Sequence, residues 1–279
     1  MLGIRIASAA VLIPPVGLVL LAGQPWIGLL VLVIAALAAR EVFALLKEAG
    51  MPGEPLLGTA IALVLVAGTW LRDARPGDAW LLVALGLVIA ALGAMWRPDP
   101  RTGFQVWLST VFGSLYVGLL AFLLLIVGRA APIPAGAPLA TWLGDGRAWL
   151  LVGVIGVWAY DSGAYLVGRT WGRHPFMAHI SPHKTWEGVA GGTALAVGVT
   201  FMTLWAAGAW TPGAVVLGAM VALAAQVGDL AESVLKRAAG AKDSGRLIPG
   251  HGGMLDRIDS ILFAAPVVYL YMIVSGSAG

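Results

Sequence analysis

The feature that most constrains this chain is a series of nine apolar runs that recur along its whole length. A helix needs about 20 apolar residues to cross roughly 30 Å of hydrocarbon. One such run could be the core helix of a soluble protein, but nine leave too little polar surface to coat one. We therefore predict an all-α, polytopic integral membrane protein with about nine transmembrane helices. The runs are Ile6–Ala22, Trp26–Leu46, Leu56–Leu71, Ala79–Trp96, Val106–Gly128, Trp149–Val167, Val189–Trp210, Ala214–Leu235 and Ile258–Ser275.

The composition supports this prediction and excludes several kinds of site. Hydrophobic residues make up 59% of the 279 residues and charged residues 11%, with a mean hydropathy of +0.90. Because the chain has no cysteine, disulfides, thiolate metal sites and cysteine nucleophiles are excluded. The net charge of +3 favours anionic lipid surfaces. Nucleic acid is not an expected partner, since the basic residues are scattered in short loops without an aromatic platform.

The distribution of basic residues predicts the orientation. If the N-terminus is cytoplasmic, 13 of the 17 Lys and Arg residues fall on the cytoplasmic side. The positive-inside rule therefore predicts a cytoplasmic N-terminus and an outer C-terminus. Arg5 and the apolar stretch after it resemble a signal peptide, but Pro14 and Pro15 in its middle favour a retained helix. The four basic residues on the outer side are Arg72, Arg75, Arg129 and Arg147.

Unusual polar residues gather in the second half of the chain. We expect one membrane domain, 1–279, in which residues 1–148 form a scaffold and residues 149–279 carry the active site. The Pro- and Gly-rich segment Ala131–Gly146 is predicted to be an outer connector between the halves.

Two polar segments precede the densest one. In the first, Trp158–Phe176, Asp161 lies within an apolar helix, where a carboxylate has either a function or a structural ion-pair partner. The small residues Ser162, Gly163 and Gly168 nearby would let another helix, or a ligand, approach closely. The second is Ile180–Gly188, which could also be a solvated loop that only follows the charge bias. Three of its side chains can donate hydrogen bonds to phosphate: Ser181, Lys184 and Thr185.

The third polar segment follows the helical period. Asp229, Ser233, Lys236 and Arg237 stand at i, i+4, i+7 and i+8, which places them on one stripe of a helix, with Gln226 and Glu232 beside them. Such a stripe faces a bundle interior or a water-filled cavity and not lipid. The opposite face is apolar and holds Leu223, Val227, Leu230 and Val234.

A charged, glycine-rich loop follows that helix and leads into the last apolar run. Asp256 and Asp259 share one face at the start of that run. Carboxylates that converge from two helices are hard oxygen ligands suited to Mg²⁺, which usually also binds substrate phosphates. The turn Gly250–Gly253 can point backbone N–H groups at an anion, next to a helix N-terminus. An ordinary flexible loop is the alternative. Five cations surround these groups: Lys236, Arg237, Lys242, Arg246 and Arg257.

The stretch "SVLKRAAGAKDSGRLIPGHGGMLDRID", Ser233 to Asp259, resembles the signature of the phosphatidate cytidylyltransferases, also called CDP-diacylglycerol synthases. "DSGAYLVGR", "ISPHKTWEG" and "RIASAAVLIP" resemble the same family. One departure is His183, where lysine is common in relatives, and it leaves one phosphate or headgroup contact open.

The resemblance implies that CTP and phosphatidic acid react to give CDP-diacylglycerol and pyrophosphate with Mg²⁺, and a second cation is considered. It implies metal binding by Asp229 and Asp256, to which we add Asp259. The other expected catalytic residues are Lys236, Arg237, Lys242 and Asp243. The expected substrate-binding residues are Asp161, Ser181, Lys184, Thr185, Ser233, His251, Gly252, Gly253 and Arg257.

The expected partners are CTP, phosphatidic acid and membrane lipids, with a second copy of the chain as a candidate for a homodimer. High Ala and Gly content suggests a bacterium, so the inner membrane is expected, with the active site facing the cytoplasm. Two other functions stay open from the residues alone. One is a CTP-dependent kinase for a polyprenol-type lipid. The other is a cation-coupled transporter with Asp161, Asp229 and Asp256 along its ion path.

Overall fold

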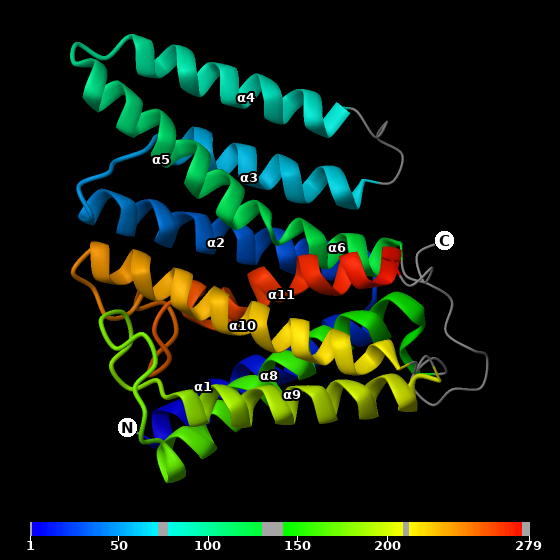
Figure 1. Ribbon diagram of the computed structural model, residues 1–279. Coiled ribbons are helices and arrows are strands. Elements are labelled where there is room, and N and C mark those ends of the chain that lie inside the picture. Colours follow the sequence, from blue (N-terminus) through cyan, green and yellow to red (C-terminus); the bar gives the residue numbers. More distant parts are fainter. Residues whose placement is uncertain (1, 72–77, 130–141, 209–211, 275–279) are drawn as a thin grey trace. The chain divides into compact units, whose positions relative to one another are not determined.

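The computed structural model describes residues 2–71, 78–129, 142–208 and 212–274, and its regular elements in these ranges are helices (Figure 1). Each predicted apolar run coincides with one helix, except that Val106–Gly128 coincides with a pair. This confirms the all-α class. The helices are α1 (Leu2–Ala22), α2 (Trp26–Glu48), α3 (Pro55–Trp70), α4 (Asp78–Met95), α5 (Pro100–Gly118), α6 (Ala121–Gly128), α8 (Asp145–Trp171), α9 (Trp186–Ala206), α10 (Gly213–Ala238) and α11 (Leu255–Val274).

Six spans in the described residues are long and apolar enough to cross a membrane. They are α2, α5 together with α6, α8, α9, α10 and α11, while α3 and α4 contain shorter apolar stretches. Large apolar side chains on several helices are exposed, such as Leu81, Leu85 and Leu92 on α4. A contiguous apolar surface of this kind is stable against lipid and not against water, so this is a membrane protein. The count of nine crossings and the orientation of the termini stay predictions.

The chain divides into two compact units. The first contains Met1–Leu124 and Val234–Ile258, and the second contains Leu125–Ser233 and Asp259–Gly279. The boundaries fall inside α6, α10 and α11 and not between residues 148 and 149. The predicted division into scaffold and site concerns function and stays a prediction. Arg72, Arg75 and most of the predicted connector Ala131–Gly146 lie outside the described residues.

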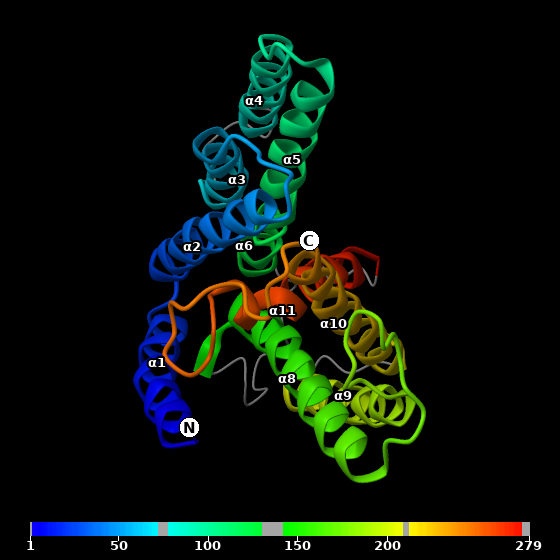
Figure 2. The same cartoon turned by 90° about the vertical axis from the view of Figure 1, so that its left-hand side faces the viewer.

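In the first unit, α2 to α5 pack against one another (Figure 2). The aromatic ring of Phe43 on α2 lies against Gly58 of α3 and Gly113 of α5, at positions where a Cβ atom would have no room. Local chemistry sets the start of α5. Pro100 occupies its first turn, where a missing N–H costs nothing. The carboxylate of Asp99 accepts hydrogen bonds from the backbone N–H and the hydroxyl of Thr102, at 2.9 and 2.7 Å.

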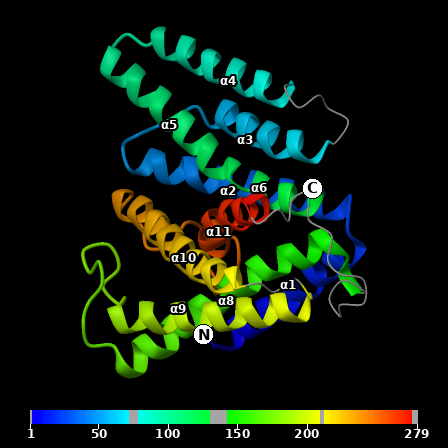
Figure 3. The same cartoon turned by 45° about the vertical axis from the view of Figure 1, so that its right-hand side comes forward.

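In the second unit, α8 and α9 run side by side (Figures 1 and 3). Glycines allow the contact, as the sequence predicted for Gly163 and Gly168. A Cβ atom on Gly163 would lie 2.9 Å from the carbonyl oxygen of Gly191, and one on Gly168 would lie 3.2 Å from Thr185 Oγ1. Small residues of this kind let membrane helices approach to backbone contact. This packing carries the polar end of α8 next to the loop that precedes α9.

Candidate active site

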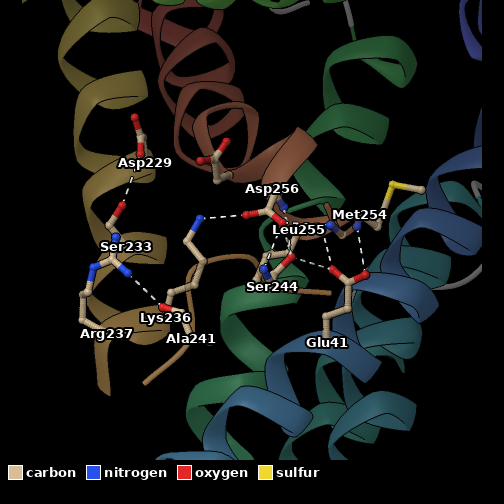
Figure 4. Close-up of polar contacts among 12 residues, drawn as sticks. Glu41, Asp229, Ser233, Lys236, Arg237, Ala241, Ser244, Met254, Leu255 and Asp256 are labelled. Carbon is tan, nitrogen blue, oxygen red and sulfur yellow. Dashed lines mark hydrogen bonds and ion pairs between the residues drawn. The ribbon is translucent and has the colours of Figure 1, made fainter. Parts of the chain in front are cut away.

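Asp256, at the start of α11, is the centre of a polar network in the first unit (Figure 4). Its Oδ1 accepts from Lys236 Nζ at 2.7 Å. Its Oδ2 accepts from the backbone N–H of Ser244 at 2.9 Å and from the N–H of Gly253 at 2.8 Å, and the Ser244 hydroxyl oxygen lies 2.9 Å from it. The side chains of Lys236 and Asp256 are only 11% and 7% exposed. The structure therefore brings together three parts of the signature: the end of α10, the loop and the start of α11.

The turn Gly250–Gly253 contacts a negative charge, and that charge is the carboxylate of Asp256 in the protein itself. Gly252 has a positive φ of 81°, and a Cβ atom there would lie 2.5 Å from Asp256 Oδ2. Only glycine accommodates both the conformation and the contact. Because the N–H of Gly253 already donates to Asp256, the predicted phosphate contacts of His251, Gly252 and Gly253 stay predictions.

Two members of this network were absent from the sequence prediction. Ser244 is buried in the loop, and Glu41 is buried near the C-terminal end of α2. The hydroxyl of Ser244 lies 2.9 Å from Glu41 Oε2 and 2.9 Å from Asp256 Oδ2 (Figure 4). A carboxylate within an apolar run is a recognised signal of function, and Glu41 carried that signal in the sequence.

In the second unit, the ion pair Lys184–Asp229 joins two of the predicted segments. Lys184 Nζ lies 2.6 Å from Asp229 Oδ2, in a close charge contact that lacks the angle of a hydrogen bond. Ser233, one turn further along α10, donates to Asp229 Oδ1 at 3.4 Å. Spacing on α10 predicted the second contact, but only the fold shows the first.

The loop before α9 holds Lys184 through a short hairpin. The N–H of Phe176 donates to the carbonyl oxygen of Lys184 at 2.8 Å, and the N–H of Trp186 donates to that of His174 at 2.9 Å. Thr185 caps α9, because its hydroxyl accepts from the N–H of Gly188 at 3.2 Å. The structure therefore gives Thr185 a capping role, and its predicted phosphate contact stays a prediction.

The two faces of α10 differ in burial as the sequence predicted. Gln226, Glu232, Ser233 and Lys236 are buried, whereas Leu223, Val227 and Val234 on the opposite face are exposed. Gln226 also accepts a hydrogen bond from the hydroxyl of Tyr160 on α8. Arg237 departs from the pattern, because it is exposed and donates to the carbonyl oxygen of Ala241 at 2.9 Å. A helix with its polar face inward and its apolar face outward suits a lipid environment.

The predicted metal ligands are divided between the two units, and most of the remaining predicted residues are exposed. Among the described residues of either unit, no three His, Asp or Glu side chains form a ready metal site. Asp256 belongs to the first unit and Asp229 and Asp259 to the second, so their convergence on a metal ion stays a prediction. Ser181 is half-buried in the hairpin loop. The exposed residues are Asp161, Lys242, Asp243 and Arg257.

Comparison with known proteins connects this site to a family. The model of the cytidylyltransferase family matches residues 3–275. The chain is 34% identical over 279 residues to phosphatidate cytidylyltransferase 4, chloroplastic, of Arabidopsis thaliana, covering 92% of this chain and 70% of that protein. It is 33% identical over 276 residues to the phosphatidate cytidylyltransferase of Mycobacterium bovis, covering 92% and 85%. A shorter match, 49% identical over 118 residues, covers 41% of this chain and 43% of the phosphatidate cytidylyltransferase of Brucella suis.

The family match extends over almost the whole chain and includes every residue of the Asp256 network and of the Lys184–Asp229 pair. The chain therefore belongs to the cytidylyltransferase family.

Proposed function

We propose that this protein transfers the cytidylyl group of CTP to phosphatidic acid, which gives CDP-diacylglycerol and pyrophosphate in phospholipid biosynthesis. The observation that carries the proposal is the buried contact between Lys236 and Asp256 within the Ser233–Asp259 signature. A lysine suited to phosphate is held there beside a carboxylate suited to a divalent cation. Relatives named phosphatidate cytidylyltransferase match the chain over most of its length.

The reaction needs little acid–base catalysis. A phosphate monoester has a second pKa of about 6, so the phosphate of phosphatidic acid is already largely ionised at neutral pH. One of its oxygens attacks the α-phosphorus of CTP, and a new P–O bond forms. The bond from the α-phosphorus to the bridging oxygen breaks, and pyrophosphate leaves with the electron pair. The main barrier is repulsion between two anions, so catalysis is mostly positioning and charge neutralisation.

The chain supplies cations for that purpose. Lys236 and Lys184 each contact one of the proposed site carboxylates, Asp256 and Asp229 respectively. We assign both ammonium groups to substrate phosphates in the loaded enzyme, together with Arg237 and Lys242. Arg237 and Lys242 are exposed, so they can reach a nucleotide that arrives from the aqueous side.

The donor set fits Mg²⁺. Asp229, Asp256 and Asp259 would hold it with carboxylate oxygens, the hard ligands that this ion prefers. The charge contacts at Asp229 and Asp256 each place an ammonium group at a carboxylate oxygen, which supports the proposal of a cation at these positions. Bound Mg²⁺ would supply charge stabilisation to the triphosphate and to the leaving pyrophosphate. A second cation, also predicted, would need further ligands from the substrate.

The membrane setting suits the lipid substrate, whose acyl chains stay in the bilayer with the phosphate at its surface. We place the protein in a bacterial inner membrane with the site facing the cytoplasm, where CTP is available. The excess of basic residues on that side supports this orientation. The homodimer stays a prediction, which the mass of the purified protein in detergent would check.

The test uses purified protein, phosphatidic acid and CTP labelled at the α-phosphate, with and without Mg²⁺. We expect label in the lipid product and pyrophosphate in solution, and loss of both when EDTA removes Mg²⁺. Label that enters lipid only from the γ-phosphate of CTP would instead indicate a lipid kinase. Cation flux in liposomes without CTP turnover would indicate a transporter. Either result would refute the proposal.

A further inference from the structure

Glu41 is a buried carboxylate in a part of the chain to which the proposed reaction assigns no residue. It lies near the end of α2, and it is 8% exposed. A buried carboxylate is costly unless several donors satisfy it. Three donors do so here, and all three come from the segment that carries Asp256 (Figure 4). They are the hydroxyl of Ser244 at 2.9 Å, the N–H of Met254 at 2.9 Å and the N–H of Leu255 at 2.8 Å.

Two of these donors belong to the start of α11. The first N–H groups of a helix have no partner within it, and a negative charge at a helix N-terminus is favourable. Glu41 therefore caps α11 from another helix. It accepts from the N–H of Leu255, the first residue of α11, and from the N–H of Met254, the residue before it. Asp256 is the next residue along α11, so its backbone position depends on this cap.

The third donor links Glu41 directly to the environment of Asp256. The Ser244 hydroxyl lies between the two carboxylates, and its backbone N–H also donates to Asp256. Two glycines let the loop reach the carboxylate. A Cβ atom on Gly245 would lie 2.7 Å from Glu41 Oε1, and one on Gly253 would overlap both Ser244 and Glu41.

We propose that Glu41 is a positioning residue for the transferase reaction: it holds the start of α11 and Ser244, and through both it orients Asp256 toward Lys236. This inference rests on the proposed function for the role of Asp256. It assigns a function to α2, within the predicted scaffold. Glu41 does not contact the reacting atoms in this role, so its effect must appear through the ligands that Asp256 and Lys236 bind.

The test is Glu41→Gln, with Glu48→Gln as the matched control. Gln keeps the size of the side chain, but its NH₂ group must face at least one of the three donors. Glu48 lies on the same helix, two turns away, and is exposed. We expect kcat/KM of Glu41→Gln to fall about 10- to 100-fold, the range for groups that orient metal ligands. The control should stay within about twofold, as exposed substitutions do.

Two further measurements separate positioning from a purely structural role. Glu41→Gln should need more Mg²⁺ for half-maximal activity. The rise in melting temperature that CTP and Mg²⁺ produce without phosphatidic acid should also shrink, because weaker ligand binding stabilises less. Ser244→Ala should shift both quantities in the same direction. The double variant should be less impaired than the product of the two single effects predicts, since both act on one carboxylate.

Wild-type turnover and a wild-type ligand-induced melting shift in Glu41→Gln would overturn the inference. A lower melting temperature with an unchanged Mg²⁺ requirement would also overturn it, because it would show a structural role alone. If Glu41→Gln does not fold, an unchanged Mg²⁺ requirement in Ser244→Ala decides against the inference. If the wild type forms no CDP-diacylglycerol, the proposed function fails, and the inference is then judged on the melting shift with CTP and Mg²⁺.

Discussion

Removing the charge of Asp256 should damage stability and turnover through two separable effects. In Asp256→Asn, a single amide oxygen replaces two carboxylate oxygens that together accept from Lys236, Ser244 and Gly253. If that oxygen faces Ser244 and Gly253, the NH₂ group faces the ammonium. In the opposite orientation the NH₂ group faces the backbone N–H groups of Ser244 and Gly253, which are donors as well. Either way, the buried Lys236 loses its ion pair with Asp256.

The burial of this pair sets the size of the effect. Both side chains are almost fully buried, so water screens the lost interaction only weakly. Breaking such a pair by removing one partner costs about 3–5 kcal/mol, whereas replacing both partners by apolar groups is often close to neutral. We therefore expect Asp256→Asn to lower the free energy of unfolding by about 3–5 kcal/mol. Adding Lys236→Met should recover most of that loss.

Turnover should behave differently from stability. Asp256→Asn should nearly abolish CDP-diacylglycerol formation while the protein still inserts into the membrane, and the double variant should be stable and inactive. Stability is measured by unfolding in detergent, and turnover with CTP labelled at the α-phosphate. If Asp256→Asn unfolds like the wild type, or if Lys236→Met recovers no stability, the reasoning from the buried pair is wrong. Near-normal turnover would refute the metal role of Asp256.

Three further predictions address other parts of the chain. Asp229→Asn should nearly abolish turnover without preventing membrane insertion, and near-normal activity of the purified variant would contradict its metal role. Lys47→Ala, on the predicted scaffold and exposed, should leave kcat/KM nearly unchanged, so a large loss would show that the division into scaffold and site is wrong. The hydroxyl of Thr102, with the backbone N–H groups of Thr102 and Arg101, holds the pKa of Asp99 below its ordinary value. Stabilisation of α5 by Asp99 should therefore be complete above the ordinary carboxyl pKa and fade as the pH falls toward the lowered one. Thermal unfolding of Asp99→Asn at acidic and neutral pH should show less of this dependence than the wild type.

Much of the fold could be predicted because each membrane-spanning helix is specified by the length and hydropathy of one continuous segment of the sequence. The length and hydropathy of each run predict a helix, and helical spacing predicts which residues share a face. The nine runs therefore correspond to the helices of the structure. The polar stripe with Gln226 and Ser233 is buried, and Leu223 opposite it is exposed. The stretch from Ser233 to Asp259 also indicated the chemistry, because it resembles the signature of a known family.

Contacts between distant segments could not be predicted in this way. Helical spacing relates residues a few positions apart, whereas Ser244 and Glu41 are 203 positions apart. The pairing of Lys184 with Asp229 depends on how the hairpin before α9 packs against α10. The turn Gly250–Gly253 is a second example. Its composition predicted that it contacts an anion, but only the fold shows that the carboxylate of Asp256 is in contact with it.

The sequence by itself thus determined the lipid environment and the helical class, because these follow from composition and local spacing, and its resemblance to a family indicated the kind of chemistry. The tertiary structure alone decided which charges meet. It placed Glu41 at the start of α11, and a buried carboxylate is stable there because the fold supplies three donors.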